Sequence, residues 1–144
     1  MKIIKDILAT KGHEVYTISP AGTVYEALSL MAEKNVGSLV ILEGETLVGL
    51  ISERDYARKI VLKGRLSRNT PVSEIMTREP VTVTLDHDLE QCMELMTDKR
   101  VRHLPVVDQG RLIGIISIGD VVKGIMDHKE FIIQELQKYI RGQH

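Results

Sequence analysis

The sequence GLISERD at residues 49–55 recurs as GIISIGD at residues 114–120. The interval is 114 − 49 = 65 residues, and the same shift aligns residues 16–61 with residues 81–126 without a gap. A fixed offset over this length predicts two copies of one structural unit. The repeat could carry only a fold, or it could also carry a binding site.

Each copy contains the residue patterns of a strand, a helix, two strands joined by a turn and a second helix. The extended stretches are VYTIS and PVTVT, the capping-box helix starts are Thr23 with Glu26 and Asp88 with Gln91, and the final helices begin near Ser52 and Ser117. The order β-α-β-β-α therefore occurs twice, and the fold class is α+β (α/β).

A single copy would bury too little apolar surface to be stable alone. Two copies related by pseudo-twofold symmetry are therefore expected to pack sheet to sheet around a joint core. Similar lead-ins, IKDIL and VSEIM, precede the two copies with an offset of 68 residues. We place the first repeat at residues 1–64, the second at 65–127 with a polar linker at 63–74, and an extra amphipathic C-terminal helix at 128–144.

The composition is that of a soluble globular protein. The 144 residues are 43% hydrophobic and 27% charged, and no apolar run reaches the roughly 18 to 20 residues needed to cross a bilayer. The N-terminus becomes polar too quickly for a secretory signal. The lone Cys92 lies on the apolar face of its helix, where a core position is expected, and cannot form an internal disulfide. The sequence therefore predicts a cytoplasmic protein without membrane insertion.

Over essentially its whole length the chain resembles a tandem pair of CBS (cystathionine-β-synthase) domains, a Bateman module. The motifs that carry the resemblance are TVYEALSLMAEKNVGSLVILEGETLVGLISERD and DLEQCMELMTDKRVRHLPVVDQGRLIGIISIGD. The chain is similar in particular to stand-alone bacterial CBS-pair signal-transduction proteins. The resemblance implies a regulatory protein, not an enzyme, that binds AMP, ADP, ATP, NAD(H) or S-adenosylmethionine in clefts between its repeats.

Each repeat places a serine three residues before an aspartate at its final helix start: Ser52 with Asp55, and Ser117 with Asp120. This spacing can serve helix capping alone. It can also bind a nucleotide, because a helix start attracts anions and a carboxylate accepts hydrogen bonds from both hydroxyls of a ribose. Capping does not require the preceding Gly49 and Gly114, which lack a Cβ and would allow close approach to the backbone.

The resemblance implies a role for each residue of the two sites. The ribose would bind Asp55 and Asp120 with help from Ser52 and Ser117, the adenine would lie against Thr17, Ile18, Thr82, Val83 and Ile116, and the phosphates would meet Arg54, Arg58, Arg102 and His103. The two sites are not expected to be equivalent, because Gly37 and Ser38 stand in the first repeat where the second has Arg102 and His103. One site would take a longer phosphate chain or a dinucleotide, and the other AMP.

Other interpretations remain open. The basic residues could form solvated surfaces, or the run from Arg54 to Arg68 could bind nucleic acid, against which the net charge of −1 and the few aromatic residues argue. A purely structural dimerisation module is a third possibility. No catalytic arrangement or metal site is recognisable. A homodimer is expected, with the face of Ile132, Leu136, Tyr139 and Ile140 extending its interface, and an effector protein in trans.

Overall fold

The chain forms two compact units whose boundaries differ from those of the sequence repeats. The computed structural model describes residues 2–141. Unit 1 contains residues 2–13, 82–108 and 114–141, and unit 2 contains residues 14–81 and 109–113. The segment ahead of each repeat therefore belongs to the unit that holds the other repeat.

Unit 2 is built on a four-stranded sheet of order β1-β2-β3-β4. Its elements are β1 (Thr17–Ile18), α2 (Val24–Lys34), β2 (Ser38–Glu43), β3 (Thr46–Ser52), α3 (Glu53–Tyr56), a π-helical continuation (Ala57–Val61), 3-10 turns at Ser67–Asn69 and Val72–Glu74, and β4 (Thr77–Arg78). β1 pairs parallel with β2, and β2 pairs antiparallel with β3. β4 adds to the edge of β3 in antiparallel register.

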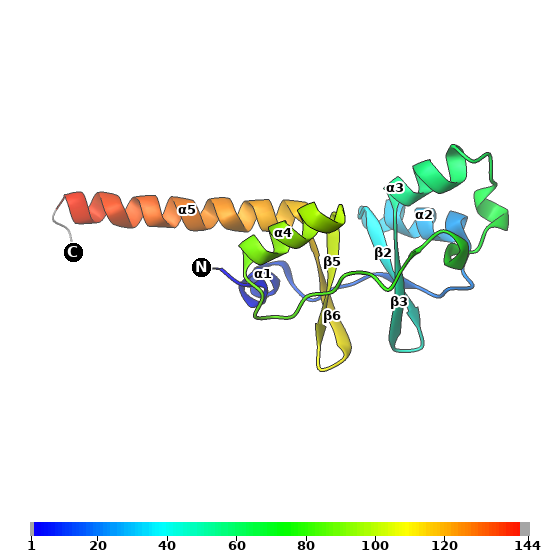
Figure 1. Ribbon diagram of the computed structural model, residues 1–144, viewed down its shortest axis with the longest axis horizontal. Coiled ribbons are helices and arrows are strands. Elements are labelled where there is room, and N and C mark those ends of the chain that lie inside the picture. Colours follow the sequence, from blue (N-terminus) through cyan, green and yellow to red (C-terminus); the bar gives the residue numbers. More distant parts are fainter. Residues whose placement is uncertain (1, 142–144) are drawn as a thin grey trace. The chain divides into compact units, whose positions relative to one another are not determined.

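Unit 1 repeats this plan with fewer paired strand residues (Figure 1). Its elements are α1 (Ile4–Lys11), α4 (Leu89–Lys99), β5 (His103–Asp108), β6 (Arg111–Ser117), whose first three residues group with unit 2, and α5 (Ile118–Ile140). β5 and β6 form a two-stranded sheet. The expected strand at PVTVT is reduced to a single parallel bridge between Val83 and Val106.

The predicted helix starts are confirmed. The Thr23 hydroxyl accepts a hydrogen bond from the Glu26 N–H at 3.1 Å, and the Asp88 carboxylate accepts one from the Gln91 N–H at 2.8 Å. The two helices also end alike, because the residues after them have a left-handed φ of 55° at both Asn35 and the Arg100 that stands 65 positions later. The repeat thus extends to backbone conformation.

Buried apolar residues occupy matching positions in the two repeats. The matching pairs are Val24 with Leu89, Ala27 with Cys92, Met31 with Met96, Leu39 with Leu104, Ile41 with Val106 and Ile51 with Ile116. All of these side chains are at most 3% exposed. Cys92 therefore lies in the core, as its position on the apolar helix face predicts.

The two lead-ins dock through the same hydrogen bonds, each in the unit of the other repeat. In unit 1 the Ile4 N–H donates to the carbonyl of His87 at 2.9 Å. In unit 2 the Val72 N–H donates to the carbonyl of Gly22 at 2.8 Å. Ile4 and Val72 are both fully buried. The two lead-ins, which are offset by 68 residues, thus exchange places between the two repeats, which are offset by 65 residues.

The C-terminal segment is continuous with the second repeat. The helix expected from residue 128 has no start of its own, because α5 runs unbroken from Ile118 to Ile140. The last residues of the expected helix, 142–144, lie outside the described residues. Within residues 2–141 no helix is both long and apolar enough to span a bilayer.

Candidate functional site

The first Ser-x-x-Asp motif forms a helix cap in unit 2. Ser52 is the N-cap of α3, and its hydroxyl accepts a hydrogen bond from the Asp55 N–H at 3.2 Å. In return, the Ser52 N–H and hydroxyl donate to Oδ2 of Asp55 at 2.9 and 3.1 Å. The Asp55 side chain is 17% exposed. The motif therefore holds a carboxylate in a fixed, partly buried position at a helix start.

The second motif forms the same cap in unit 1. The Ser117 N–H donates to Oδ2 of Asp120 at 2.8 Å, and the Ser117 hydroxyl accepts from the Asp120 N–H at 3.1 Å. The Asp120 side chain is 24% exposed. Each helix start is also tied to the residue just before β2 or β5, since the Glu53 N–H donates to the Gly37 carbonyl at 3.1 Å and the Ile118 N–H to the Arg102 carbonyl at 2.9 Å.

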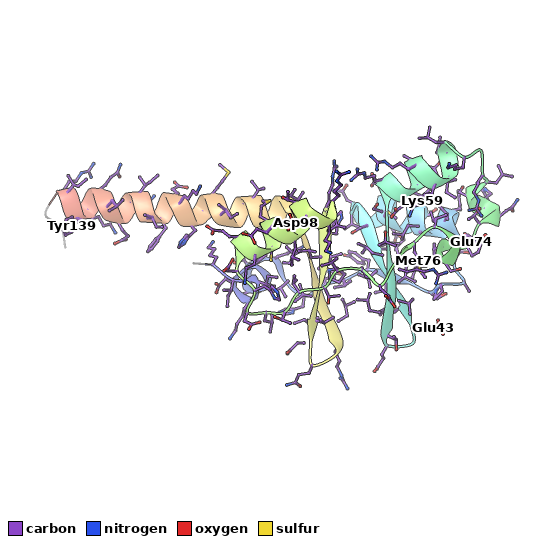
Figure 2. The ribbon with its side chains drawn as sticks, in the orientation of Figure 1. Glu43, Lys59, Glu74, Met76, Asp98 and Tyr139 are labelled. Carbon is purple, nitrogen blue, oxygen red and sulfur yellow. The ribbon has the colours of Figure 1, made fainter. Side chains whose placement is uncertain are left out.

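Each aspartate is paired with a lysine that the sequence analysis missed. In unit 2 the Lys59 Nζ lies 3.2 Å from Oδ1 of Asp55, and it also donates to the carbonyl of Ile75 at 2.8 Å. The spacing of four residues on one helix is a signal that could have found Lys59. Figure 2 shows Lys59 on the helical segment that follows α3.

Lys11 is the corresponding lysine in unit 1. Its Nζ lies 2.6 Å from Oδ2 of Asp120 and 2.8 Å from the carbonyl oxygen of Ile115. It comes from the end of α1, 109 residues before Asp120. No sequence spacing could reveal this pair, because it depends on the exchange of the lead-ins.

These contacts set the pKa of Asp120. Burial opposes its ionisation, but the hydrogen bonds from Lys11 and Ser117 and the positive charge of Lys11 outweigh burial. The pKa of Asp120 is therefore below its usual value of 3.8. The carboxylate is ionised at neutral pH and acts as a hydrogen-bond acceptor.

The glycines before the motifs are packed against side chains of the protein itself. A Cβ at Gly49 would lie 2.5 Å from Sδ of Met76 and 3.1 Å from the carbonyl oxygen of Thr77. A Cβ at Gly114 would lie 2.9 Å from a methyl carbon of Leu8. Leu8 and Met76 occupy equivalent positions in the two lead-ins. Close packing of the lead-ins therefore explains why both positions are glycine.

The predicted phosphate-binding residues of unit 1 lie at the start of β5. Arg102 is exposed and His103 is half-buried. Burial lowers the pKa of His103 below its usual value of 6.5, and the charges of Lys11 and Arg102 lower it further, while Asp120 opposes them. His103 is therefore neutral at pH 7, and the positive charge that acts on Asp120 comes from Lys11.

The predicted phosphate-binding residues of unit 2 lie on the helix instead. Arg54 and Arg58 are both exposed. Other members of the basic run already have partners within unit 2: Arg65 pairs with Glu74 at 3.1 Å, and the Arg68 guanidinium lies 3.9 Å from the ring centre of Tyr25. These contacts leave fewer cations for phosphates, which argues against the nucleic-acid interpretation.

The predicted adenine contacts differ in exposure. Thr17 is exposed, and Ile18 and Thr82 are half-buried. Val83 and Ile116 are 1% and 0% exposed and belong to the core. Side chains as buried as Val83 and Ile116 shape the surrounding backbone. Direct contact of a side chain with a base is therefore expected from Thr17, Ile18 and Thr82.

Two further kinds of group bear on possible chemistry, namely the Cys92 thiol and clusters of metal-binding side chains. Burial raises the pKa of the Cys92 thiol to about 11, and the charge of Asp88 acts in the same direction. A thiol with so high a pKa is a poor nucleophile at neutral pH. Among residues 2–141, no group of three or more His, Cys, Asp or Glu side chains is arranged to hold a metal ion.

Comparison with known proteins gives the family. The CBS domain family matches residues 4–62 and 72–127. A mitochondrial CBS domain-containing protein of Arabidopsis thaliana, CBSX3, is 40% identical over an alignment of 148 positions that covers 96% of this chain and 72% of the relative. A solved structure of a protein with CBS domains from Burkholderia ambifaria has a TM-score of 0.84 and 45% identity, and the match covers 88% of this chain and 95% of that one.

A third similar protein was solved with ligands. The CBS domain pair of protein MJ0100, in complex with 5-methylthioadenosine and S-adenosyl-L-methionine, has a TM-score of 0.78 and 25% identity. The match covers 89% of this chain and 98% of that chain. Both halves of the present chain match one family, in the order and positions of the internal repeat. The chain therefore belongs to the CBS-domain family and contains two CBS domains in tandem.

Proposed function

We propose that this protein is a non-catalytic regulatory module that binds adenosyl nucleotides, namely AMP, ADP, ATP or NAD(H), at its two Ser-x-x-Asp sites. S-adenosylmethionine is a further candidate, since the similar CBS pair of MJ0100 was solved with it. The observation that carries the proposal is the doubled site, in which a partly buried carboxylate is held at a helix start. Neither site resembles a catalytic arrangement.

The contacts of the two aspartates suit reversible ligand binding. Each carboxylate is oriented by the N–H of its serine, so a ribose would find an acceptor already in place. The lysine contacts are exchangeable, because an ion pair at a partly exposed position contributes roughly 0 to 1 kcal/mol. Hydrogen bonds from hydroxyls to a carboxylate contribute about 1.5 to 3 kcal/mol each. A ribose can therefore displace the lysine with a net gain.

The two sites offer phosphates different cations. In unit 1 a displaced Lys11 would stay near neutral His103, on which the charge of Arg102 also acts. In unit 2 the cations are Lys59, Arg54 and Arg58, all from the helical segment. This difference supports two sites that prefer ligands with different phosphate groups.

Signalling by such a module requires a partner. A ligand can shift the protein between two arrangements only through its different affinity for them. We propose that the protein acts as a homodimer in the cytoplasm and passes the ligand signal to an effector protein in trans.

The proposal is tested by calorimetric titration of AMP, ATP, NAD and S-adenosylmethionine into the wild-type protein and the Asp55→Asn and Asp120→Asn variants. Asparagine keeps an oxygen that can accept the serine N–H, so the fold is expected to survive. Loss of the charged acceptor should weaken binding at the altered site by about 2 to 4 kcal/mol, or roughly 30- to 1000-fold.

Asp88→Asn is the control, because Asp88 is also the aspartate of a capping box, as the N-cap of α4, but lies outside both motifs. It should lower stability slightly and leave the affinities unchanged. Unchanged affinity in both the Asp55 and Asp120 variants would overturn the ribose assignment. No measurable binding of any of the four ligands to the wild-type protein would overturn the function itself.

A further inference from the structure

The apolar side chains in the second half of α5 are not covered by other parts of the described chain. Every residue from Lys129 to Arg141 is exposed, including Ile133 at 54%, Leu136 at 56% and Ile140 at 80%. Figure 1 shows this part of α5 extending past α1 and α4 of its own unit, and Figure 2 places Tyr139 near its far end. A lone helix of this length is only marginally stable in water, and its apolar side chains favour a partner.

Five of the exposed apolar residues of α5 follow a heptad pattern along one face, and Ile118, Phe131, Ile132 and Tyr139 lie off this face. The residues of this face, which we call the α5 seam, are Gly119, Val122, Met126, Lys129, Ile133, Leu136 and Ile140. They alternate in steps of three and four, which is the pattern of a coiled coil. Five of them, from Gly119 to Ile133, line one shallow groove on the surface of unit 1. The seam thus begins in the folded unit and continues to the end of the helix, about 33 Å in all.

We propose that the α5 seam binds the α5 seam of a second copy of this chain in an antiparallel arrangement. The inference specifies the interface of the homodimer proposed above and does not depend on nucleotide binding. The sizes of the side chains along the seam match in this arrangement. With a twofold axis near residues 127 and 128, Leu136 lies opposite Gly119 of the second copy, and Ile133 lies opposite Val122. Ile133 and Leu136 then meet the two smallest side chains of the seam, Val122 and Gly119.

The charge within the seam also favours one direction of pairing. Lys129 is the one charged member, and it is exposed. In a parallel pair Lys129 would face Lys129 of the second copy inside the seam, where like charges repel. In the antiparallel pair it lies opposite Met126, on which its aliphatic stem can pack while the ammonium remains in water. The seam therefore favours the antiparallel direction.

The charges beside the seam favour the same direction. Lys123 and Glu130 are exposed, line the same groove and lie seven residues apart on one flank. Antiparallel pairing brings Lys123 of each copy opposite Glu130 of the other, which gives two ion pairs related by symmetry. In a parallel pair these residues would face the apolar positions Ile118 and Ile125. The charges are thus complementary to a second copy of the same helix in one direction only.

Sedimentation equilibrium over a range of protein concentrations tests the interface. The wild-type protein should be a dimer. Ile133→Asp should weaken the dimer by about 100-fold or more, because it places a charge in the seam. Phe131→Asp is the matched control, because Phe131 is equally exposed, at 57%, but lies off the seam, and it should leave the dimer intact.

A charge exchange tests the direction. Glu130→Lys alone should weaken the dimer by about tenfold, because it places two lysines opposite each other. Adding Lys123→Glu should restore wild-type affinity. A double variant that remains as weak as the single variant would overturn the antiparallel arrangement.

The outcomes also separate this interface from the proposed function. A monomeric wild-type protein would overturn both the seam dimer and the homodimer. The α5 seam would then be assigned to contact with a different protein. A dimer that persists in Ile133→Asp would overturn the seam and keep the homodimer. Nucleotide affinities of Ile133→Asp, measured by calorimetry, report on the ligand sites whatever the assembly.

Discussion

The two Ser-x-x-Asp sites have the same backbone and different charges around it. Both serines cap a helix and both aspartates return a hydrogen bond to the serine N–H. The lysine of the first site comes from the next turn of the same helix, whereas that of the second comes from α1. The arginines differ as well, since Arg54 lies on a helix and Arg102 at a strand start. Two repeats can therefore share the backbone of a candidate binding site while the charges around it differ.

The largest difference between the sites is expected from the glycines. Gly49→Ala should destabilise the protein by about 2 to 3 kcal/mol and Gly114→Ala by about 1 kcal/mol, because overpacking costs more where the backbone must move. The Cβ at Gly49 would approach the carbonyl of Thr77, whereas that at Gly114 meets only the end of Leu8. Urea denaturation measures both values.

Gly37→Ala provides the control for these variants, since a Cβ there would have no neighbour within 4 Å. It should change the free energy of unfolding by no more than about 0.5 kcal/mol. Equal losses from Gly49→Ala and Gly114→Ala would show that the two lead-ins pack with the same tolerance, against the structure.

A smaller difference is expected from the lysines. Lys11→Met should destabilise the protein by about 1 kcal/mol and Lys59→Met by about 0.3 kcal/mol, after allowance for solvent screening of partly exposed pairs. The Lys11 pair is shorter, 2.6 against 3.2 Å, and its lysine is less exposed, 34% against 44%. Methionine keeps most of the apolar stem and removes the charge. Thermal denaturation at low and high salt measures the contribution of each ion pair to stability. A larger loss of stability in Lys59→Met than in Lys11→Met would contradict this order.

The smallest effect is expected from His103, which the first repeat replaces by Ser38. The pKa of His103 is below 6.5 in the folded protein, so the folded state binds fewer protons than the unfolded chain. Its contribution to stability is therefore complete above pH 6.5 and decreases as the pH falls below that value. Asp120 acts in the same direction only at lower pH, as the pH falls below 3.8.

His103→Gln should make the unfolding free energy less dependent on pH between 7 and 5, at about the same stability at pH 7. Denaturant titrations at several pH values measure this slope. An unchanged slope in the variant would mean that His103 is not held in its neutral form.

Local features of the fold were predictable because they depend on spacing along the chain. The caps at Thr23 and Asp88 and the doubled motif follow from hydrogen bonds between residues three apart. The shortened strand at Val83 was not predictable from the residue pattern, because strand length depends on the partner available for pairing. The long α5 was predicted as two helices, since the repeat ends inside it.

The amino-acid order alone determined the repeat, its element order and the positions of Asp55 and Asp120, because these depend on periodicity and on contacts within one helical turn. Only the tertiary structure decided that each lead-in docks in the unit of the other repeat, that Lys11 reaches Asp120, and that Leu8 and Met76 pack on the two glycines. The physical reason is that such contacts join residues far apart in the chain, and no local pattern records which of them become neighbours when the core closes.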